Sequence, residues 1–130
     1  MPSFHDTAET PAPPEEVWKL LYDPSRFPEW WAGIETAELG GDEGDFTMYP
    51  DGYPDFPMPQ LLDTSRDEQR VTVSCLVSDL RFEWRLEPRD DGGTLIAVHV
   101  DIPVAEAARL DTQRGAIAAS LVNLASLAHA

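Results

Sequence analysis

The sequence predicts an α+β domain in which an antiparallel β-sheet is covered by one long C-terminal helix. Apolar and polar residues alternate with a period of two in the last three strand-like stretches, which indicates a sheet with one dry and one wet face. The final segment, 104–130, is rich in Ala and Leu and contains one Gly and no Pro. It therefore favours a helix long enough to cover the dry face.

The N-terminal part predicts one strand followed by two short helices. Ser3–Thr10 alternates weakly and is expected to form the first strand, which the prolines at 11–14 end. Pro14 suits the first turn of a helix, and the apolar stripe of this helix comprises Val17, Leu20 and Leu21. The helix should end near Asp23, because the residue before a proline is disfavoured in helical conformation. Residues 24–31 should form a second short helical turn.

Six further strands are expected, joined by turn-rich links that make antiparallel hairpins. They are Ile34–Leu39, Asp45–Tyr49, Gln60–Ser65, Arg70–Val77, Leu80–Pro88 and Thr94–Ile102, with turns at 40–44 and 78–79 among the links. The dry face of the last three comprises Val71, Val73, Cys75, Val77, Leu80, Phe82, Trp84, Leu86, Ile96, Val98, Val100 and Ile102. Their opposite face is polar and includes Thr72 and His99. The matching stripe of the final helix comprises Leu110, Ile117, Leu121, Leu124 and Ala128.

Composition bounds the class of protein and its partners. A chain of 130 residues with 42% apolar residues is expected to form one domain, 1–130, with a real core. Its 9 basic and 24 acidic residues give a net charge of −15, which disfavours nucleic acid and anionic membranes as partners. There is a single cysteine, no secretory signal and no membrane-length apolar run, so a cytoplasmic protein without membrane insertion is expected.

Three segments resemble a known family. Pro11–Trp18, Asp23 and Phe27–Trp31 look like the opening of the polyketide cyclase/dehydrase branch of the START/Bet v 1-like (SRPBCC) superfamily, and 121–128 looks like its last helix. The resemblance implies a helix-grip fold: a curved seven-stranded antiparallel sheet around a long C-terminal helix, with two short helices after the first strand and a cavity between sheet and helix. Because the family includes lipid carriers, cyclases, dehydratases, co-chaperones and toxins, the resemblance is nearly silent on chemistry. The chain is short for this family, so a small cavity is expected.

The predicted lining of the cavity is mostly apolar. It comprises Trp30, Trp31, Met48, Phe56, Met58, Phe82, Trp84, Val98, Val100, Leu110, Arg114 and Ile117. Alternatively, these residues pack on one another and fill the core. Neighbours on a helix point about 100° apart, so Trp30 and Trp31 are not expected to be buried together. One of them should anchor the helical turn, and the other should lie at the cavity mouth.

Few polar residues are candidates for a site. Arg114 falls on the apolar stripe of the last helix, where it either reaches water, pairs with Asp101 or Asp63, or clamps a ligand carbonyl or carboxylate. Asp63, or Gln60 before it, would place a polar group in the pocket. Tyr49 is a third candidate, with Arg114 and Asp63, for orienting carbonyls. No pair of acids can be placed on one buried face.

Several features are expected to be structural. The proline-rich segment 50–59, with Tyr53, Phe56 and Met58, is either a stiff connection or a lid over the cavity mouth. The histidines at 5, 99 and 129 lack metal-site spacing, so no metal site and no cofactor are expected. His99 is interpreted as exposed rather than as a general base, and Cys75 as a small buried hydrophobe.

Three classes of function remain. The favoured one is a binding module for a small hydrophobic or aromatic molecule, of polyketide or lipid type. The alternative is a cofactor-independent polyketide cyclase or aromatase-dehydratase, and the weakest is a protein-interaction role. Two facing ionisable groups in the pocket would favour the enzyme, and one or none would favour binding. A monomer or homodimer is expected.

Overall fold

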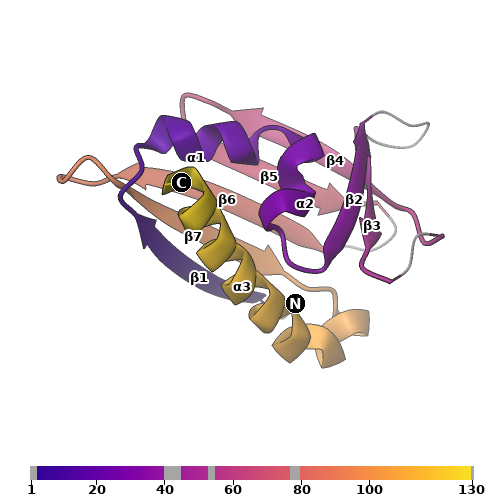
Figure 1. Ribbon diagram of the computed structural model, residues 1–130. Coiled ribbons are helices and arrows are strands. Elements are labelled where there is room, and N and C mark those ends of the chain that lie inside the picture. Colours follow the sequence, from indigo (N-terminus) through magenta and orange to yellow (C-terminus); the bar gives the residue numbers. More distant parts are fainter. Residues whose placement is uncertain (1–2, 40–44, 53–54, 77–79, 130) are drawn as a thin grey trace.

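The computed structural model describes residues 3–39, 45–52, 55–76 and 80–129, which form seven strands and three α-helices (Figure 1). In chain order the elements are β1 (Ser3–Thr10), α1 (Pro14–Leu21), a 3₁₀ turn (Pro24–Arg26), α2 (Phe27–Trp30), β2 (Ile34–Leu39), β3 (Phe46–Pro50), β4 (Met58–Ser65), β5 (Arg70–Cys75), β6 (Arg81–Pro88), β7 (Thr94–Asp101), a second 3₁₀ segment (Val104–Arg109) and α3 (Leu110–His129).

All seven strands form one antiparallel sheet in the order β1-β7-β6-β5-β4-β3-β2. Strands β2 to β7 are joined as hairpins, and β1 pairs with β7 over its whole length. Helix α3 lies on one face of the sheet beside β1, and α1 and α2 lie on the same face (Figure 1). This arrangement confirms the helix-grip architecture that the sequence predicts.

The inner face of the sheet carries the core. Nine inward residues on β5, β6, β7 and the residue after β7 are almost fully buried: Val71, Val73, Phe82, Trp84, Leu86, Ile96, Val98, Val100 and Ile102. Cys75 and Leu80 are half-buried, because they lie at strand ends. Thr72 was expected on the wet face, yet it is buried. It lies on the middle strand between Asp63 and Glu83 in the register, so that longer side chains flank it.

The predicted element boundaries need few corrections. The first six residues of the final helical segment form a 3₁₀ helix rather than α-helix, which is common where a helix begins. Strand β3 ends at Pro50 and β4 begins at Met58, so three residues of the proline-rich segment belong to the sheet: Pro50, Met58 and Pro59. The predicted turns at 40–44 and 78–79, together with Tyr53 and Val77, lie outside the described residues.

Hydrogen bonds from buried threonines hold the first and last elements together. The Thr10 hydroxyl at the end of β1 donates to the Ala125 carbonyl of α3, at 2.9 Å. The Thr94 hydroxyl at the start of β7 donates to the Ala12 carbonyl, at 2.8 Å. Both threonines are at most 3% exposed. The Thr10 bond fixes the end of α3 over the corner where β1 and β7 meet, and the Thr94 bond joins β7 to the segment after β1.

Two glycine substitutions should move the free energy of unfolding in opposite directions. A Cβ on Gly93 would clash with the Thr10 carbonyl oxygen, so Gly93→Ala should destabilise the fold by about 1–3 kcal/mol. Gly115 lies inside α3 with no atom near a built Cβ, so Gly115→Ala should stabilise it by about 0.5–1 kcal/mol. Urea denaturation measures both changes. A stabilised Gly93→Ala variant would contradict the close approach of β1 and β7.

Candidate functional site

Six aromatic rings meet between α2 and the inner face of the sheet, and we call them the aromatic cluster: Phe27, Trp30, Trp31, Phe46, Phe82 and Trp84. Each contacts at least one other with ring centroids 4.8 to 5.5 Å apart, mostly edge to face. None is more than 4% exposed. Edge-to-face packing of this kind adds to the hydrophobic gain of burial, so α2 is firmly joined to the sheet.

Trp30 and Trp31 are both buried, which corrects the prediction that they would not be buried together. Trp30 is the last residue of α2, and Trp31 follows with extended backbone angles (φ −80°, ψ 105°), so the helical 100° rule does not relate them. Their rings stack at 5.5 Å with an interplanar angle of 21°. Both also meet Trp84 edge to face, at 5.1 and 5.4 Å.

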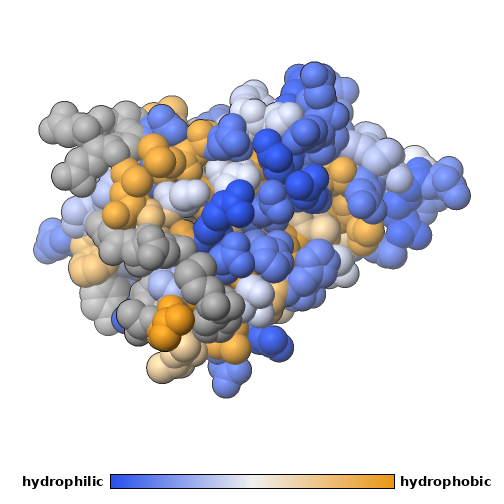
Figure 2. All heavy atoms as spheres, turned by 180° about the vertical axis from the view of Figure 1, so that it is seen from behind, coloured by the Kyte–Doolittle hydropathy of each residue, from blue (hydrophilic) through white to orange (hydrophobic). Residues whose placement is uncertain are grey.

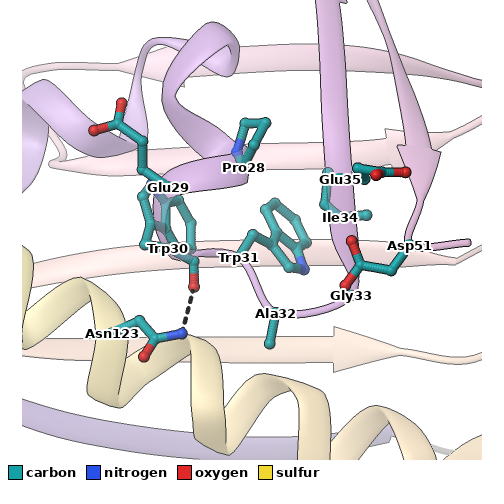
Figure 3. A pocket seen from close by; sticks show the side chains of 10 residues that line it. All are labelled: Pro28, Glu29, Trp30, Trp31, Ala32, Gly33, Ile34, Glu35, Asp51 and Asn123. Atoms are coloured by element: carbon teal, nitrogen blue, oxygen red, sulfur yellow. Dashed lines mark hydrogen bonds between the residues drawn. The ribbon is translucent and has the colours of Figure 1, made fainter.

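Helix α3 holds the segment after α2 by two hydrogen bonds. The buried Ser120 hydroxyl accepts from the Ala32 amide at 2.8 Å and donates to the Ala116 carbonyl at 2.6 Å. The Asn123 side-chain amide donates to the Trp30 carbonyl at 3.3 Å (Figure 3). Neither polar residue was recognised from the sequence. The one available signal is that Ser120 falls three residues after Ile117, within the apolar stripe of the helix.

An open hollow of about 290 Å³ lies outside this segment (Figure 3). It is lined by Pro28, Glu29, Trp30, Trp31, Ala32, Gly33, Ile34, Glu35, Asp51 and Asn123. Trp31 borders the hollow on one side and touches Phe82 and Trp84 on the other. Figure 3 shows its indole nitrogen on the side of the hollow where Gly33 and Asp51 lie. The Trp31 ring thus forms a wall between the hollow and the rings of Phe82 and Trp84, and Trp30 borders the hollow as well.

Much of the predicted lining packs on itself. Among the described residues, Phe82, Trp84, Val98, Val100 and Ile117 belong to one buried cluster, as does Met48. Met58 and Leu110 are partly buried against that cluster. A second hollow, of about 400 Å³, lies at the β6–β7 turn, and neither hollow is enclosed between the sheet and α3. The alternative in which these residues fill the core therefore describes the packing in this structure.

Phe56 and Arg114 lie on the surface. Phe56 is 58% exposed, in the segment before β4. The Arg114 side chain is exposed, and its guanidinium lies 5.5 Å from the centroid of the Phe4 ring on β1. The carboxylates considered as its partners pair elsewhere, Asp101 with Arg81 and Asp63 with Arg70. Of the expected alternatives, the structure shows Arg114 reaching water over an aromatic face.

The three catalytic candidates do not come together. Asp63 and Tyr49 both point to the outer face of the sheet, and the Tyr49 hydroxyl donates to Glu38 at 3.4 Å. Arg114 lies in α3, on the opposite side of the sheet. The ambiguous phase of β4 is resolved by Gln60, which is 1% exposed and faces inward, so that Asp63, three residues later, faces outward.

Two buried polar atoms on the inner face have no hydrogen-bond partner. The Gln60 side-chain amide donates to the Met58 carbonyl at 3.1 Å, but its Oε1 accepts nothing. The indole Nε1 of Trp84 donates to no oxygen or nitrogen. The Arg70 Nε is also unpartnered, although that guanidinium pairs with Glu68 and Asp63. Buried groups of this kind are rare in native proteins, and an ordered water is one partner that satisfies them.

Ionisable groups lie outside the core. The buried polar residues among those described are uncharged: Thr10, Gln60, Thr72, Thr94 and Ser120. His99 lies on the outer face with its Nε2 at 3.0 Å from Asp101 Oδ1. The described part of the chain contains no group of three His, Cys, Asp or Glu side chains arranged to hold a metal ion. Within it, no helix is long and apolar enough to cross a membrane.

Comparison with known protein families identifies the family of this chain. The model of the family described as polyketide cyclase/dehydrase and lipid transport matches residues 1–129. The chain belongs to this family. Membership supports a ligand-binding or cyclase role. No curated protein matches the sequence of this family member.

Solved structures of similar fold are distant in sequence. ZhuI aromatase/cyclase from a Streptomyces species superposes with a TM-score of 0.80 at 16% identity, covering 98% of this chain and 93% of its own. The protein XoxI from Bacillus cereus gives 0.76 at 17% identity, with 97% and 94% covered. The di-domain ARO/CYC protein BexL gives 0.75 at 13% identity, and the match covers 95% of this chain and 46% of BexL. At these identities the comparisons support the fold.

The carboxyl group of Glu29, at the rim of the hollow, should titrate below its usual range. The Arg26 guanidinium donates to it twice, at 2.9 and 3.1 Å, and these hydrogen bonds lower the pKa of Glu29. Stability from this exposed pair should be present above the unfolded-state pKa and lost as the pH falls through the folded-state pKa. Carboxyl ¹³C NMR titration measures the pKa. Arg26→Ala should raise it toward the ordinary value, whereas Lys19→Ala, in the separate pair with Glu16, should not.

Removing the Ser120 hydroxyl should loosen the segment after α2. Ser120→Ala leaves the Ala32 amide without its acceptor, which should cost about 1–3 kcal/mol in the free energy of unfolding. Amide hydrogen exchange at Ala32 should also accelerate. Ser126→Ala, an exposed serine on the same helix, is the matched control and should change neither quantity. Equal effects of the two variants would contradict the bracing role of Ser120.

Proposed function

We propose that the protein binds a small hydrophobic or aromatic molecule, of polyketide or lipid type, between the inner face of the sheet and the α2–α3 side. The observation that carries the proposal is the position of Trp31. Its ring separates an open hollow from a cluster of five further aromatic rings. Displacing this single side chain joins the hollow to an apolar, aromatic interior, which is the usual character of a ligand pocket.

The local backbone is consistent with movement of Trp31. Trp31 lies just beyond the last turn of α2, and Gly33 follows with φ +92°, a conformation that favours glycine. The segment is anchored on both sides of Trp31, through the Trp30 carbonyl and the Ala32 amide. Rotation of the Trp31 side chain therefore does not require these backbone bonds to break. The ligand ring would take the place of the indole against Phe82 and Trp84.

The polarity of the interior favours binding over chemistry. The buried polar residues described are threonine, serine and glutamine, and none of them ionises near neutral pH. General acid–base catalysis requires an ionisable side chain within hydrogen-bond reach of the reacting group. The alternative is a cyclase or aromatase-dehydratase acting on a poly-keto chain, a proposal supported by the family description and by the activity named for ZhuI. Turnover of a poly-keto thioester, abolished by a variant of an inner residue, would favour that alternative.

The remaining parts of the proposal concern partners and place. A net charge of −15 argues against nucleic acid as a partner, because the negatively charged protein and the negatively charged phosphate backbone would repel each other. A cytoplasmic protein that acts as a monomer or homodimer, without membrane insertion, is consistent with this composition. Light scattering of the purified protein distinguishes the two oligomeric states.

Native mass spectrometry and a binding titration test the proposal. The purified protein should retain a small molecule or bind 2-naphthol, a two-ring aromatic probe, in equilibrium dialysis. Trp31→Leu should bind 2-naphthol more tightly than the wild type, because the variant removes the wall that the ligand must displace. The same substitution should lower the free energy of unfolding by about 2–4 kcal/mol, since it leaves a cavity among the rings.

Trp18→Leu is the matched control. Trp18 is also buried, at 6% exposure, but it lies in α1, stacks on Tyr22, does not line the hollow and makes no ring contact with the described aromatic cluster. This variant should be destabilised without a gain in affinity. A bare protein that binds no 2-naphthol, in the wild type and in Trp31→Leu alike, would refute the binding role.

A further inference from the structure

We propose that the open hollow outside Trp31 binds a small organic ammonium compound that carries a hydroxyl group, which is the chemistry of an amino alcohol. The Asp51 and Glu35 carboxylates bind the ammonium group, and the Trp31 indole Nε1 donates a hydrogen bond to the hydroxyl oxygen. All three side chains line this hollow. The ligand occupies the hollow while Trp31 keeps its place, so this site is separate from the interior site proposed above.

The indole nitrogen of Trp31 is a polar group without a partner in the protein. The residue is 4% exposed, and its Nε1, an obligate donor, makes no hydrogen bond to any described residue. By contrast, the Nε1 of Trp30 donates to the Leu20 carbonyl at 3.1 Å. Figure 3 shows the Trp31 nitrogen on the side of the hollow where Asp51 lies. A donor that faces an open hollow is satisfied either by water or by an acceptor on a ligand.

The pairing of β2 with β3 places two carboxylates at the same hollow. The Asp51 amide donates to the Gly33 carbonyl at 3.0 Å, which fixes Asp51 beside the segment after α2. The register of the two strands shifts around Glu35, so Glu35 is an extra residue in β2, and a bulge of this kind redirects side chains. Figure 3 shows the Asp51 side chain turned to the side of the hollow where the Trp31 indole lies.

The charge of these two carboxylates is not neutralised by the described part of the protein. Neither Asp51 nor Glu35 forms an ion pair with a described basic residue. Glu29, the third carboxylate of the lining, pairs with Arg26 and points away from Asp51 in Figure 3. Among the described residues that line the hollow, none is basic. The hollow therefore attracts a cation and repels an anionic ligand.

The hollow favours an organic cation over a metal ion. The described residues contain no group of three acidic, His or Cys side chains arranged as metal ligands. A volume of about 290 Å³ has room for a molecule of several heavy atoms, and Pro28, Ile34 and the Trp31 ring offer contacts to a short carbon chain. An ammonium group has no lone pair to accept the indole hydrogen bond, so the same ligand must also present an oxygen.

Three probes with the same three-carbon chain separate the two contacts: propylamine, 3-amino-1-propanol and 1-propanol. Binding is followed by ¹H–¹⁵N NMR of the wild type near neutral pH and at low salt. The amino alcohol should shift the indole N–H resonance of Trp31, which is identified by its loss in Trp31→Phe. It should bind about two- to tenfold more tightly than propylamine, because it alone among the two accepts from the indole. The uncharged 1-propanol should bind more weakly than the amino alcohol.

Two variants test the two contacts separately. Asp51→Asn should weaken the binding of 3-amino-1-propanol about two- to fivefold, because it removes one exposed carboxylate from the ammonium group. Asp90→Asn removes the same charge at the β6–β7 turn, outside this hollow, and is the matched control that should keep the wild-type affinity. Trp31→Phe keeps an aromatic ring without the N–H, so it should bind the amino alcohol no more tightly than propylamine. The denaturation midpoint of Asp51→Asn should equal that of the wild type.

The possible results are distinct. Equal affinities of the wild type for propylamine and 3-amino-1-propanol would refute the indole contact. Equal affinities of Asp51→Asn and Asp90→Asn for the amino alcohol would refute the carboxylate contact. If no probe shifts the Trp31 N–H resonance, water satisfies the indole and the ammonium site is refuted. None of these results changes the outcome of the 2-naphthol titration, which tests the interior site.

Discussion

The packing of α2 against the inner face of the sheet is the constraint on which the rest of the structure depends. An open antiparallel sheet with one apolar face is stable only if that face is covered, and α3 reaches mainly its β1 side. The other side is covered by the rings of α2 and the residue after it, which interlock with Phe46, Phe82 and Trp84. A helix of four residues can do this because aromatic side chains bury a large area per residue.

The sheet and the helix that covers it were predictable, because the residues of both follow regular patterns of apolar and polar side chains. Alternation in the last three strands fixes which face is buried, and the alanine- and leucine-rich end fixes what covers it. The candidate site was less predictable. In β4, Leu61 and Leu62 are both apolar, so the sequence does not show which residues of the strand face the core. The pairing of Gln60 with Phe46 and Cys75 in the sheet shows that Gln60 faces inward. Burial of both Trp30 and Trp31 depends on a change of backbone conformation at the helix end, for which the sequence carries no periodic signal.

Charge is separated from the interior. Hydrophilic side chains cover much of the outer face of the sheet, and apolar ones gather mainly in the left half of the view (Figure 2). The outer ion pairs, such as Arg81 with Asp101 and Arg85 with Glu83, are partly exposed and contribute little to stability. The ionised side chains thus lie on the surface, whereas the buried polar residues described are uncharged.

The buried hydroxyl of Ser120 sets the position of α3 along its own axis. Apolar contacts between a helix and a sheet are nearly interchangeable, so a helix rich in Ala and Leu has little to define its register. A shift by one turn, about 5.4 Å, would place Ala116 or Leu124 opposite the Ala32 amide, and neither side chain has an acceptor. Together with the Asn123 and Ala125 hydrogen bonds, this serine therefore favours one alignment of α3, and with it the position of Trp31.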